Sequence, residues 1–436
     1  MTEPGGRRAA ATGVRMDEQY KDGIPRESRK TGFLQSFDRQ KLDPSDPADF
    51  SSKLLSFVRQ NKVAADALIA GNVQMLGFEA LKERFGEQWH GIKDKVLLLT
   101  EGVIKKHITA DDVYCLINDE KFIVLFGKAT KPDATRTAQA IGREVNAKLS
   151  GAGAGADAVS VRPMVFEVPR SDPVVLRSPA ALEETVEEAQ KRAQAAESAR
   201  VEQAKDQMRM RFWPVANVRK RLVSCYHADL HVPDGAAIGF DPNEPSDTGA
   251  VEATIDRLVL QRSGTALVEA ASQHWRALLI VPVHYETLAA KGYRNQYLEV
   301  CRLLPRIAEK RMFLMVRGLS DDVPQGRLHT LFSYLAPYVA GFIGDFSLEF
   351  HRAGKLGGVR MVAIAVDGHS ITTTDARNVA ALKGFVHANR GIRMRRYFYG
   401  ATSFEAASAA RRAQFDYVQG IGVAPSMPVA GKVFRV

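Results

Sequence analysis

The stretch FDYVQGIGVAP, from Phe415 to Pro425, decides the fold. Its apolar residues lead into a Gln-Gly pair and then a loop, which is typical of a buried strand that ends at the edge of a sheet. β-rich runs alternate with helical segments before it, which predicts βα units and a parallel sheet. These runs include LLIVPV (278–283), RMFLMV (311–316), VAGFIG (339–344), RMVAIAV (360–366) and RRYFYG (395–400).

A closed (β/α) barrel of the TIM type is the simplest architecture for residues 212–436. Two further runs, FWPVANV (212–218) and RLVSCYHADL (221–230), precede the alternating part and supply the opening strands. In such barrels the chemistry lies where the strands end. We therefore predict that the functional residues follow or close these runs.

The composition fits a folded protein with more than one domain. The chain has 436 residues and a formal charge of +10, but its basic residues are scattered and partly concentrated at the start. No zinc-binding, helix-turn-helix or aromatic RNA-binding pattern accompanies them, so we expect no nucleic-acid partner. Cys115, Cys225 and Cys301 are far apart, which favours reduced thiols. No signal peptide or membrane span is predicted, and we expect a cytoplasmic protein.

Four segments are predicted along the chain. Residues 1–48 have little periodicity and are predicted to be a disordered basic arm. Residues 49–172 contain a helical segment, extending to about Phe85, and then a small α+β module. Residues 173–211 form a helical linker, and residues 212–436 form the barrel.

The α+β module is predicted from three neighbouring patterns. VYCLINDEKFIVLF (113–126) has two β-rich runs around a polar turn, which is typical of a hairpin. DATRTAQAIGREVNAKL (133–149) has one apolar helix face, and AVSVRPMVFEV (158–168) returns as a strand. Helix, hairpin, helix and strand together make half of a ferredoxin-like sandwich.

A long helix is predicted from Ser178 to about Arg211. Ser178 is a favourable N-cap, Pro179 suits the first helical position, and acidic residues occupy the following turns. Its heptad-like stripe includes Leu182, Val186 and Ala189. A short coiled-coil homodimer and a monomeric spacer that packs on its neighbours both fit this stripe.

The closing motif FDYVQG resembles the end of the EAL domain, the barrel that hydrolyses cyclic di-GMP in bacterial signalling. FWPVANVRKRLVSCYHADLHV resembles the family's opening strands, with His227, Asp229 and His231 at the signature Glu, Leu and Arg. LIVPVHYETL resembles the next strand, with Pro282 at the metal-binding Asn and His284 at a Ser. The resemblance implies an EAL-like fold over residues 212–436.

The later motifs of the family also have counterparts. FLMVRGLSDD places Val316 and Leu319 at two family glutamates, and GFIGDFSLEF places Gly344 and Asp345 at the Asp-Asp pair. The remaining counterparts are Ala365 at the catalytic Lys, Asp367 at a retained Asp, Tyr399 and Thr402 at two glutamates, and Gln419 at the family's Gln.

These replacements predict the loss of the family's phosphodiesterase activity. Metal-assisted hydrolysis needs several oxygen ligands around one or two divalent ions. The positions of four such ligands hold His227, Pro282, Val316 and Gly344. We therefore expect a protein that is not an enzyme, has no catalytic residue, cofactor or metal, and retains a degenerate pocket.

The region before the barrel resembles a reduced GGDEF module. Residues 118–121 occupy the turn that carries GGDEF in diguanylate cyclases, but the paired glycines that admit phosphate are missing. Cyclase activity is therefore not expected.

Three roles remain for such a protein. The preferred one is a regulatory scaffold that acts through contacts with a protein partner. A cyclic di-GMP receptor without hydrolysis is the second, with Arg317, Arg393, Arg395 and Arg396 as sources of positive charge. A repurposed metal site is the third, because His227, Asp229 and His231 alternate along one strand and His284 and Asp345 are candidates to join them. The alternative to a metal site is a pocket filled with imidazoles that bond to their neighbours.

Overall fold

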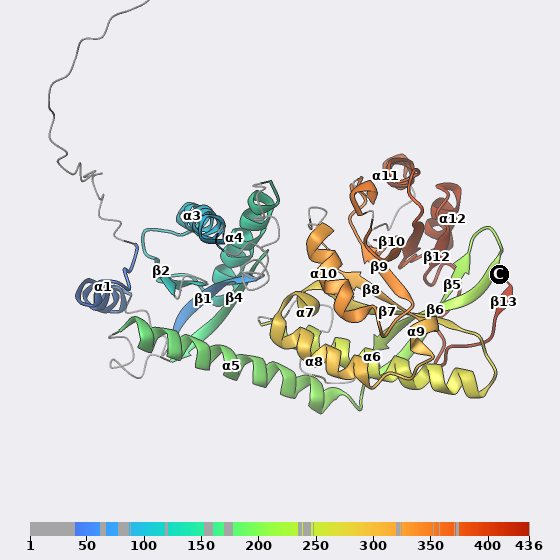
Figure 1. Cartoon of the computed structure of the whole chain (residues 1–436), viewed down its shortest axis with the longest axis horizontal. Helices are drawn as coiled ribbons and strands as arrows, with labels where there is room; N and C mark the ends of the chain where they lie inside the picture. The colour runs from blue at the N-terminus through green and yellow to red at the C-terminus, as the bar shows by residue number, and fades with distance from the viewer. Residues whose placement is uncertain are drawn as a thin grey trace, which may run out of the picture. The chain divides into compact units, whose positions relative to one another are not determined.

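The computed structural model describes residues 40–61, 67–76, 87, 89–117, 121–151, 160–169, 178–233, 238, 246, 248–319, 323, 325–351, 353–356, 358–369, 371 and 375–435 (Figure 1). Most of the predicted basic arm, the turn at 118–120 and the glycine-rich stretch 152–156 lie outside these residues. Among the described helices, none is both long and apolar enough to cross a membrane.

The first folded module is a complete ferredoxin-like βαββαβ unit. Its four strands pair antiparallel in the order β2-β3-β1-β4, and α3 and α4 pack on one face. The predicted hairpin, the helix after it and the returning strand are therefore confirmed, and β1 and α3 complete the unit. The elements are β1 (Ala67–Leu76), α3 (Trp89–His107), β2 (Val113–Ile117), β3 (Lys121–Phe126), α4 (Lys131–Gly151) and β4 (Ser160–Pro169).

The prediction of helices up to Phe85 was wrong in its second part. Helix α1 (Pro47–Gln60) forms as expected, but residues 67–76 are the central strand β1. Tertiary pairing on both edges, with β3 and β4, overrides the local helical periodicity. Gly71 fits this crowded position because a Cβ there would lie 2.9 Å from the ring of Phe126.

The predicted boundary at residue 48 also lies too late. Leu42 is fully buried in the core on the second face of the sheet, and its backbone N–H donates to the carbonyl of Tyr114 at 2.8 Å. The carbonyl of Gln40 accepts a hydrogen bond from Tyr114 N at 2.9 Å. The folded module therefore begins at residue 40 at the latest.

Helix α5 (Pro179–Ala204) joins the two cores of the chain. Its first half buries Leu182, Val186 and Ala189 beside α1 and the sheet, whereas Val201 and Ala204 belong to the barrel core. This packing corresponds to the spacer interpretation of the apolar stripe. The helix ends at Ala204 and not near Arg211, because the next residues are recruited into a strand that begins at Arg209.

Eight strands close into the predicted barrel. Each strand from β6 to β12 is parallel to the next, and β5 pairs antiparallel with both β6 and β12. The barrel begins slightly before the predicted boundary at 212. Its strands are β5 (Arg209–Asn217), β6 (Leu222–His231), β7 (Leu278–His284), β8 (Met312–Arg317), β9 (Gly341–Asp345), β10 (Met361–Asp367), β11 (Arg395–Tyr399) and β12 (Tyr417–Gln419).

Helices cover the barrel and a short strand extends its edge. Along the chain these are α6 (Ala250–Ser272), α7 (Tyr285–Ala289), α8 (Lys291–Arg302), α9 (Ala308–Arg311), α10 (Gln325–Leu335), the 3-10 helix η4 (Ala353–Leu356), α11 (Ala376–Ala388), α12 (Phe404–Arg412) and β13 (Phe434–Arg435). β13 pairs with β6 outside the ring.

The strands divide their side chains between two cores. An inner core contains Ile280, Met315, Ile343 and Ala365, while the residues next to them, such as Val281, belong to the outer core beneath the helices. Further members of the inner core are Val215, Cys225, Ala363, Tyr397 and Tyr399. This alternation decides which side chains reach the barrel mouth.

Asp416 lies at the opposite end of the barrel from the mouth. Its carboxylate accepts hydrogen bonds from the backbone N of Arg396 at 2.9 Å and from Nε at 3.0 Å. Arg396 keeps 14% of its side-chain exposure and Asp416 keeps 6%, so the pair is largely removed from water. Asp416 therefore fixes the start of β11 and is not part of the mouth.

We predict that Arg396→Gln lowers the free energy of unfolding of the barrel by about 3 kcal/mol, because it leaves the buried carboxylate of Asp416 unpaired. The matched control is Arg395→Gln, whose side chain is 60% exposed and 3.7 Å from the same carboxylate. We expect that control to cost less than about 1 kcal/mol. Urea denaturation followed by circular dichroism measures both, and equal losses would contradict this role of Asp416.

Candidate functional site

A ring of polar side chains stands at the carboxyl ends of the barrel strands. The inward positions continue the alternation of the inner core. From β7 onward one such position closes each strand, and on β6 the corresponding position lies two residues before the strand ends. They are Asp229, His284, Arg317, Asp345, Asp367, Tyr399 and Gln419. We call this set the mouth ring.

His227 lies one step below the ring and is buried. Its side chain is enclosed between Tyr397 and Tyr399, with ring centroids 6.1 and 5.7 Å away, and Nδ1 is 2.9 Å from the Tyr397 hydroxyl. Burial, reinforced by the positive charge of Arg317, lowers the pKa of His227 to about 3. The imidazole is therefore neutral near pH 7 and fills the position as part of the inner core.

Asp345 on β9 is held by a tyrosine from β11, one strand beyond its neighbour β10. The hydroxyl of Tyr399 donates a hydrogen bond to Asp345 Oδ2 at 2.9 Å. Burial raises the pKa of Asp345 to about 7, although the Tyr399 hydrogen bond and the charge of Arg317 oppose this rise. Near neutral pH this carboxyl group therefore carries only part of a negative charge.

Arg317 is the permanent cation of the mouth ring. It is the register partner of His284 on β7, and Val316 beside it pairs with Gly344 on β9. Burial lowers the pKa of Arg317, but the negative charges of Asp345, Asp367 and Asp229, together with the Tyr399 hydroxyl, outweigh this effect and raise it. The guanidinium thus compensates the acidic side chains from within the same chain.

Two histidines of the mouth are paired with aspartates. His284 Nδ1 lies 2.9 Å from Asp256 Oδ1, and His369 Nδ1 lies 2.6 Å from Asp367 Oδ1. The Asp367 hydrogen bond raises the pKa of His369, and His369 in turn helps to lower the pKa of Asp367 despite burial. Two further candidates in the degenerate pocket are thereby satisfied within the chain.

Gln419 supports the backbone instead of facing a ligand. Its Oε1 accepts a hydrogen bond from Gly400 N at 2.9 Å, and its carbonyl accepts one from Ala401 N at 2.9 Å. Gly400 has a φ of +71°, and a Cβ there would lie 2.3 Å from His369 Nδ1. A glycine is therefore required where these two strand ends meet.

The structure corrects three positions of the predicted pocket. A Cβ at Gly344 would lie 2.6 Å from Phe346 and 2.8 Å from Met361, so this position faces the outer core. Val316 belongs to the same outer core, which leaves Arg317 as the inward residue of β8. Leu319 is buried in that core too.

The proposed His-Asp-His arrangement on β6 is also not assembled. His227 is buried, whereas Asp229 is exposed and accepts a hydrogen bond from Trp213 Nε1 at 3.3 Å. His231 pairs with Arg209 at the far end of the hairpin. Within the described part of the chain, no three His, Cys, Asp or Glu side chains are grouped so that they could hold a metal ion.

Sequence reasoning missed Tyr397, His369 and Asp256. The first could have been found, since Tyr397 and Tyr399 alternate along one strand and must share a face. His369 follows the end of β10 by two residues, at a place where functional side chains are expected. Asp256 carries no local signal, because its contact with His284 spans two elements.

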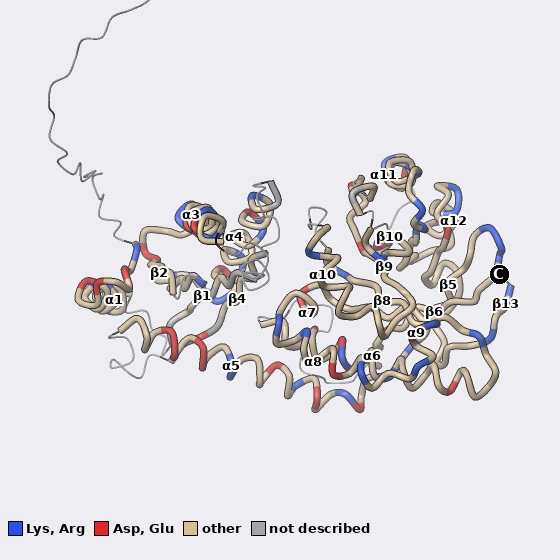
Figure 2. The backbone as a smooth tube through the Cα atoms, in the orientation of Figure 1, with Lys and Arg blue, Asp and Glu red and all other residues tan. Residues whose placement is uncertain are grey.

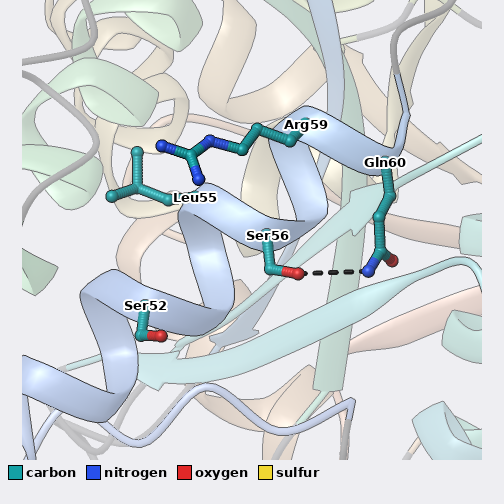
Figure 3. Close-up of a pocket in the computed structure, with 5 residues that line it drawn as sticks. All are labelled: Ser52, Leu55, Ser56, Arg59 and Gln60. Atoms are coloured by element: carbon teal, nitrogen blue, oxygen red, sulfur yellow. Dashed lines mark hydrogen bonds between the residues drawn. The ribbon is translucent and has the colours of Figure 1, made fainter.

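Pockets described outside the mouth have a different character. One of about 340 Å³ lies along the exposed side of α1 and is lined by Ser52, Leu55, Ser56, Arg59 and Gln60. Figure 3 shows these side chains on successive turns of the helix, with Gln60 Nε2 donating to Ser56 Oγ at 3.1 Å. No acid or histidine lines it, so it offers no equivalent chemistry.

Comparison with known proteins gives distant structural similarities. Vibrio cholerae LapD, solved as an S helix-GGDEF-EAL chain bound to c-di-GMP, has a TM-score of 0.47 and 12% identity, covering 85% of this chain and 93% of that one. The FimX EAL domain from Pseudomonas aeruginosa, bound to c-di-GMP, has a TM-score of 0.42 and 18% identity, covering 54% and 98%. The Xanthomonas citri FimX EAL domain in complex with c-diGMP gives 0.41 and 17%, covering 57% and 98%.

No protein-family model matches the chain, and no curated protein matches its sequence. The closed strand ladder of the barrel establishes its fold independently of these distant similarities.

We predict that Asp345→Asn removes a pH-dependent loss of stability. The pKa of Asp345 rises from its ordinary value of 3.8 to about 7 in the folded protein. Between these values the folded state holds a proton that the unfolded chain has lost, so stability falls as pH rises through this window. The loss from this group is about 2 kcal/mol after allowance for solvent screening.

Urea denaturation between pH 4 and pH 8 measures this effect as the difference between the wild type and Asp345→Asn. Tyr399→Phe is the companion variant: it removes a hydrogen bond that lowers the pKa of Asp345, so its stability should continue to fall at a higher pH. Parallel pH profiles for the wild type and Asp345→Asn would contradict the raised pKa.

Proposed function

We propose that the chain is a catalytically inactive EAL-like signalling protein that acts as a regulatory scaffold through protein contacts. The observation that supports this proposal is the pairing of the mouth ring with the chain's own groups. Asp345 is bound by Tyr399, Asp367 by His369, and Arg317 compensates the remaining negative charge.

The strand ends also lack the ligands that hydrolysis needs. Metal-assisted cleavage of a phosphodiester requires several oxygen ligands converging on a divalent ion. The inward positions of β7 and β8 carry Pro282, His284 and Arg317, and the inward position of β10 below Asp367 is the fully buried Ala365. Among the residues that the structure describes, the mouth therefore offers neither the ligand set nor the lysine on which the family's chemistry depends.

Exposed apolar residues beside the mouth support a protein-contact role. Phe404 and Ile421 are 65% and 64% exposed. Phe404 begins α12 and Ile421 lies in the loop after β12. These segments pack together, since Gly422 N donates to the Ala401 carbonyl at 3.0 Å and a Cβ on Gly422 would lie 2.9 Å from Phe404 N. We call Phe404 and Ile421 the mouth patch, and its apolar side chains are candidates to bury surface against a protein partner.

A second candidate contact surface is the acidic first half of α5. Acidic residues gather there, as Figure 2 shows, and they include Glu183, Glu184, Glu187 and Glu188. Lys121 of β3 pairs with Glu183 at 3.2 Å and with Glu187, which leaves Glu184, and Glu188 apart from its exposed pair with Arg192, for a basic partner. Arg192 lies 3.6 Å from Glu188, an exposed pair that contributes little.

We predict that the double variant Phe404→Ser, Ile421→Ser loses a protein partner that the wild type retains. Affinity purification of the tagged full-length chain from its native host measures this loss. Val268→Ser is the matched control, because Val268 is 51% exposed on α6 and away from the mouth patch. Identical recovery by the double variant and the wild type would contradict a scaffold role for the mouth patch.

A cyclic di-GMP receptor without hydrolysis is the second candidate, and Arg317 is the observation that favours it. A guanidinium at the end of β8 can bind a phosphate without a metal ion. Its electrostatic interactions with Asp229, Asp345 and Asp367 weigh against this role, because these acids repel an incoming phosphate.

We predict that cyclic di-GMP remains intact when it is incubated with the protein and Mg²⁺ or Mn²⁺, because too few oxygen ligands converge among the described residues of the mouth. Chromatography of the nucleotide measures turnover, with an active EAL phosphodiesterase as the control. Metal-dependent formation of the linear dinucleotide would contradict the proposed inactivity.

Calorimetry with cyclic di-GMP in EDTA tests the receptor alternative. Micromolar binding that Arg317→Met abolishes would favour the receptor over the scaffold.

A further inference from the structure

Asp256 is a buried carboxylate that the degenerate pocket does not explain. It lies in the second turn of α6 and is 2% exposed. Its oxygens accept hydrogen bonds from His284 N at 2.9 Å and from Thr287 Oγ1 at 2.6 Å, and Oδ1 lies 2.9 Å from His284 Nδ1, which donates to it when protonated. A buried carboxylate of this kind needs such partners to offset the loss of water.

Of these three contacts, only the one with Nδ1 involves the imidazole ring of His284. The backbone N–H of His284 and the Thr287 hydroxyl already tie the end of β7 and the start of α7 to α6. The bond to Nδ1 fixes the ring itself, as the aspartate does in an Asp–His pair that orients an imidazole. The side chain of His284 keeps 31% of its exposure, while that of Asp256 keeps 3%.

The groups around His284 define its charge state. Asp256 and Glu252 face it from α6, and Arg317 faces it from β8. Burial and Arg317 lower the pKa of His284, but the charge and hydrogen bond of Asp256, assisted by Glu252, outweigh them and raise it. His284 is therefore protonated to a larger extent than a free imidazole at the same pH.

His284 and Arg317 are neighbours across the ladder. They are direct register partners at the ends of parallel strands β7 and β8, and both occupy inward positions. Two donors on adjacent strands, one from an imidazole and one from a guanidinium, can bind two oxygens of one anion. Asp345, the next acid in register, is only partly ionised near neutral pH, which reduces repulsion.

We propose that Asp256 and His284 form an orienting dyad that presents a protonated imidazole, beside the guanidinium of Arg317, to a phosphate or carboxylate group at the carboxyl end of β7. Asp256 is the positioning residue, and His284 and Arg317 are the binding residues. No bond is made or broken in this role. The proposal does not depend on the scaffold function, because it concerns a small anion and not a protein surface.

The chain contains a matched control for this dyad. His369 and Asp367 form a second Asp–His pair at the same mouth, with Nδ1–Oδ1 at 2.6 Å. Its side chains are 66% and 42% exposed, so water screens the pair. If a buried aspartate is needed to orient His284 for anion binding, the exposed pair of His369 and Asp367 should not bind the anion in its place.

The test is a histidine NMR titration of the full-length protein, with inorganic phosphate and acetate as separate probes. We expect one of the two anions to shift the His284 ring signals and to raise the pKa of His284. Asp256→Asn should lower that pKa below the wild-type value and weaken anion binding about tenfold, the effect of losing a hydrogen bond to a charged group. Asp367→Asn should not weaken anion binding, because it removes a negative charge from the mouth.

His284→Gln provides a variant that keeps the backbone and Thr287 bonds of Asp256 and should weaken binding to the same extent. It decides the question if Asp256→Asn does not fold. A shift with phosphate alone identifies a phosphate site, and a shift with acetate alone identifies a carboxylate site. The proposal is overturned if neither anion perturbs His284 in the folded protein, or if Asp367→Asn weakens binding as much as Asp256→Asn.

Discussion

The closed ring of hydrogen-bonded strands is the constraint on which the rest of this structure depends. β5 completes the ring by pairing antiparallel with both β6 and β12, so neither end of the eight-stranded sheet is left as a free edge. Closure gives every strand an inside and an outside. The alternation of side chains then places each residue in the inner core, the outer core or the mouth, whatever its chemistry.

The mouth shows what this constraint does to ionisable groups. Side chains brought together at the strand ends lose water, and each charge then needs a partner. Tyr399 binds Asp345, Asp256 binds His284, and Arg317 compensates the acids around it. His227 loses its charge and needs no charged partner: burial lowers its pKa, and the side chain is a neutral ring. Among the described residues, the charges at the mouth are therefore compensated by side chains of the same chain.

Much of the fold could be predicted from the sequence because the barrel strands are short apolar runs with clear ends. The site was less predictable, and Gly344 and Val316 show why. The resemblance to the family's motifs placed them at ligand positions. A shift of one residue along a strand moves a side chain from the inner face to the outer face, and the sequence does not determine this register. Residues 67–76 have helical periodicity and were predicted as helix. They form a strand because pairing with β3 and β4 on its two edges outweighs this periodicity.

The contact of Asp256 with His284 could not be predicted from the sequence for a different reason. These two residues are joined only when α6 packs against the end of β7, so no local pattern connects them. The pairs that local patterns do indicate, such as Asp367 with His369, are exposed and contribute less. Long-range packing thus decides which of the mouth's ionisable groups are buried and paired.

The central claim is that the mouth is neutralised by the chain's own side chains. The most direct measurement is a carbon-detected NMR titration of the Asp345 carboxyl group in the full-length protein. The account predicts an apparent pKa of about 7 for this group, unchanged by Mg²⁺. A pKa near the ordinary aspartate value of about 4, or one that Mg²⁺ lowers, would show an open, ionised mouth that binds a metal ion, and would contradict the account.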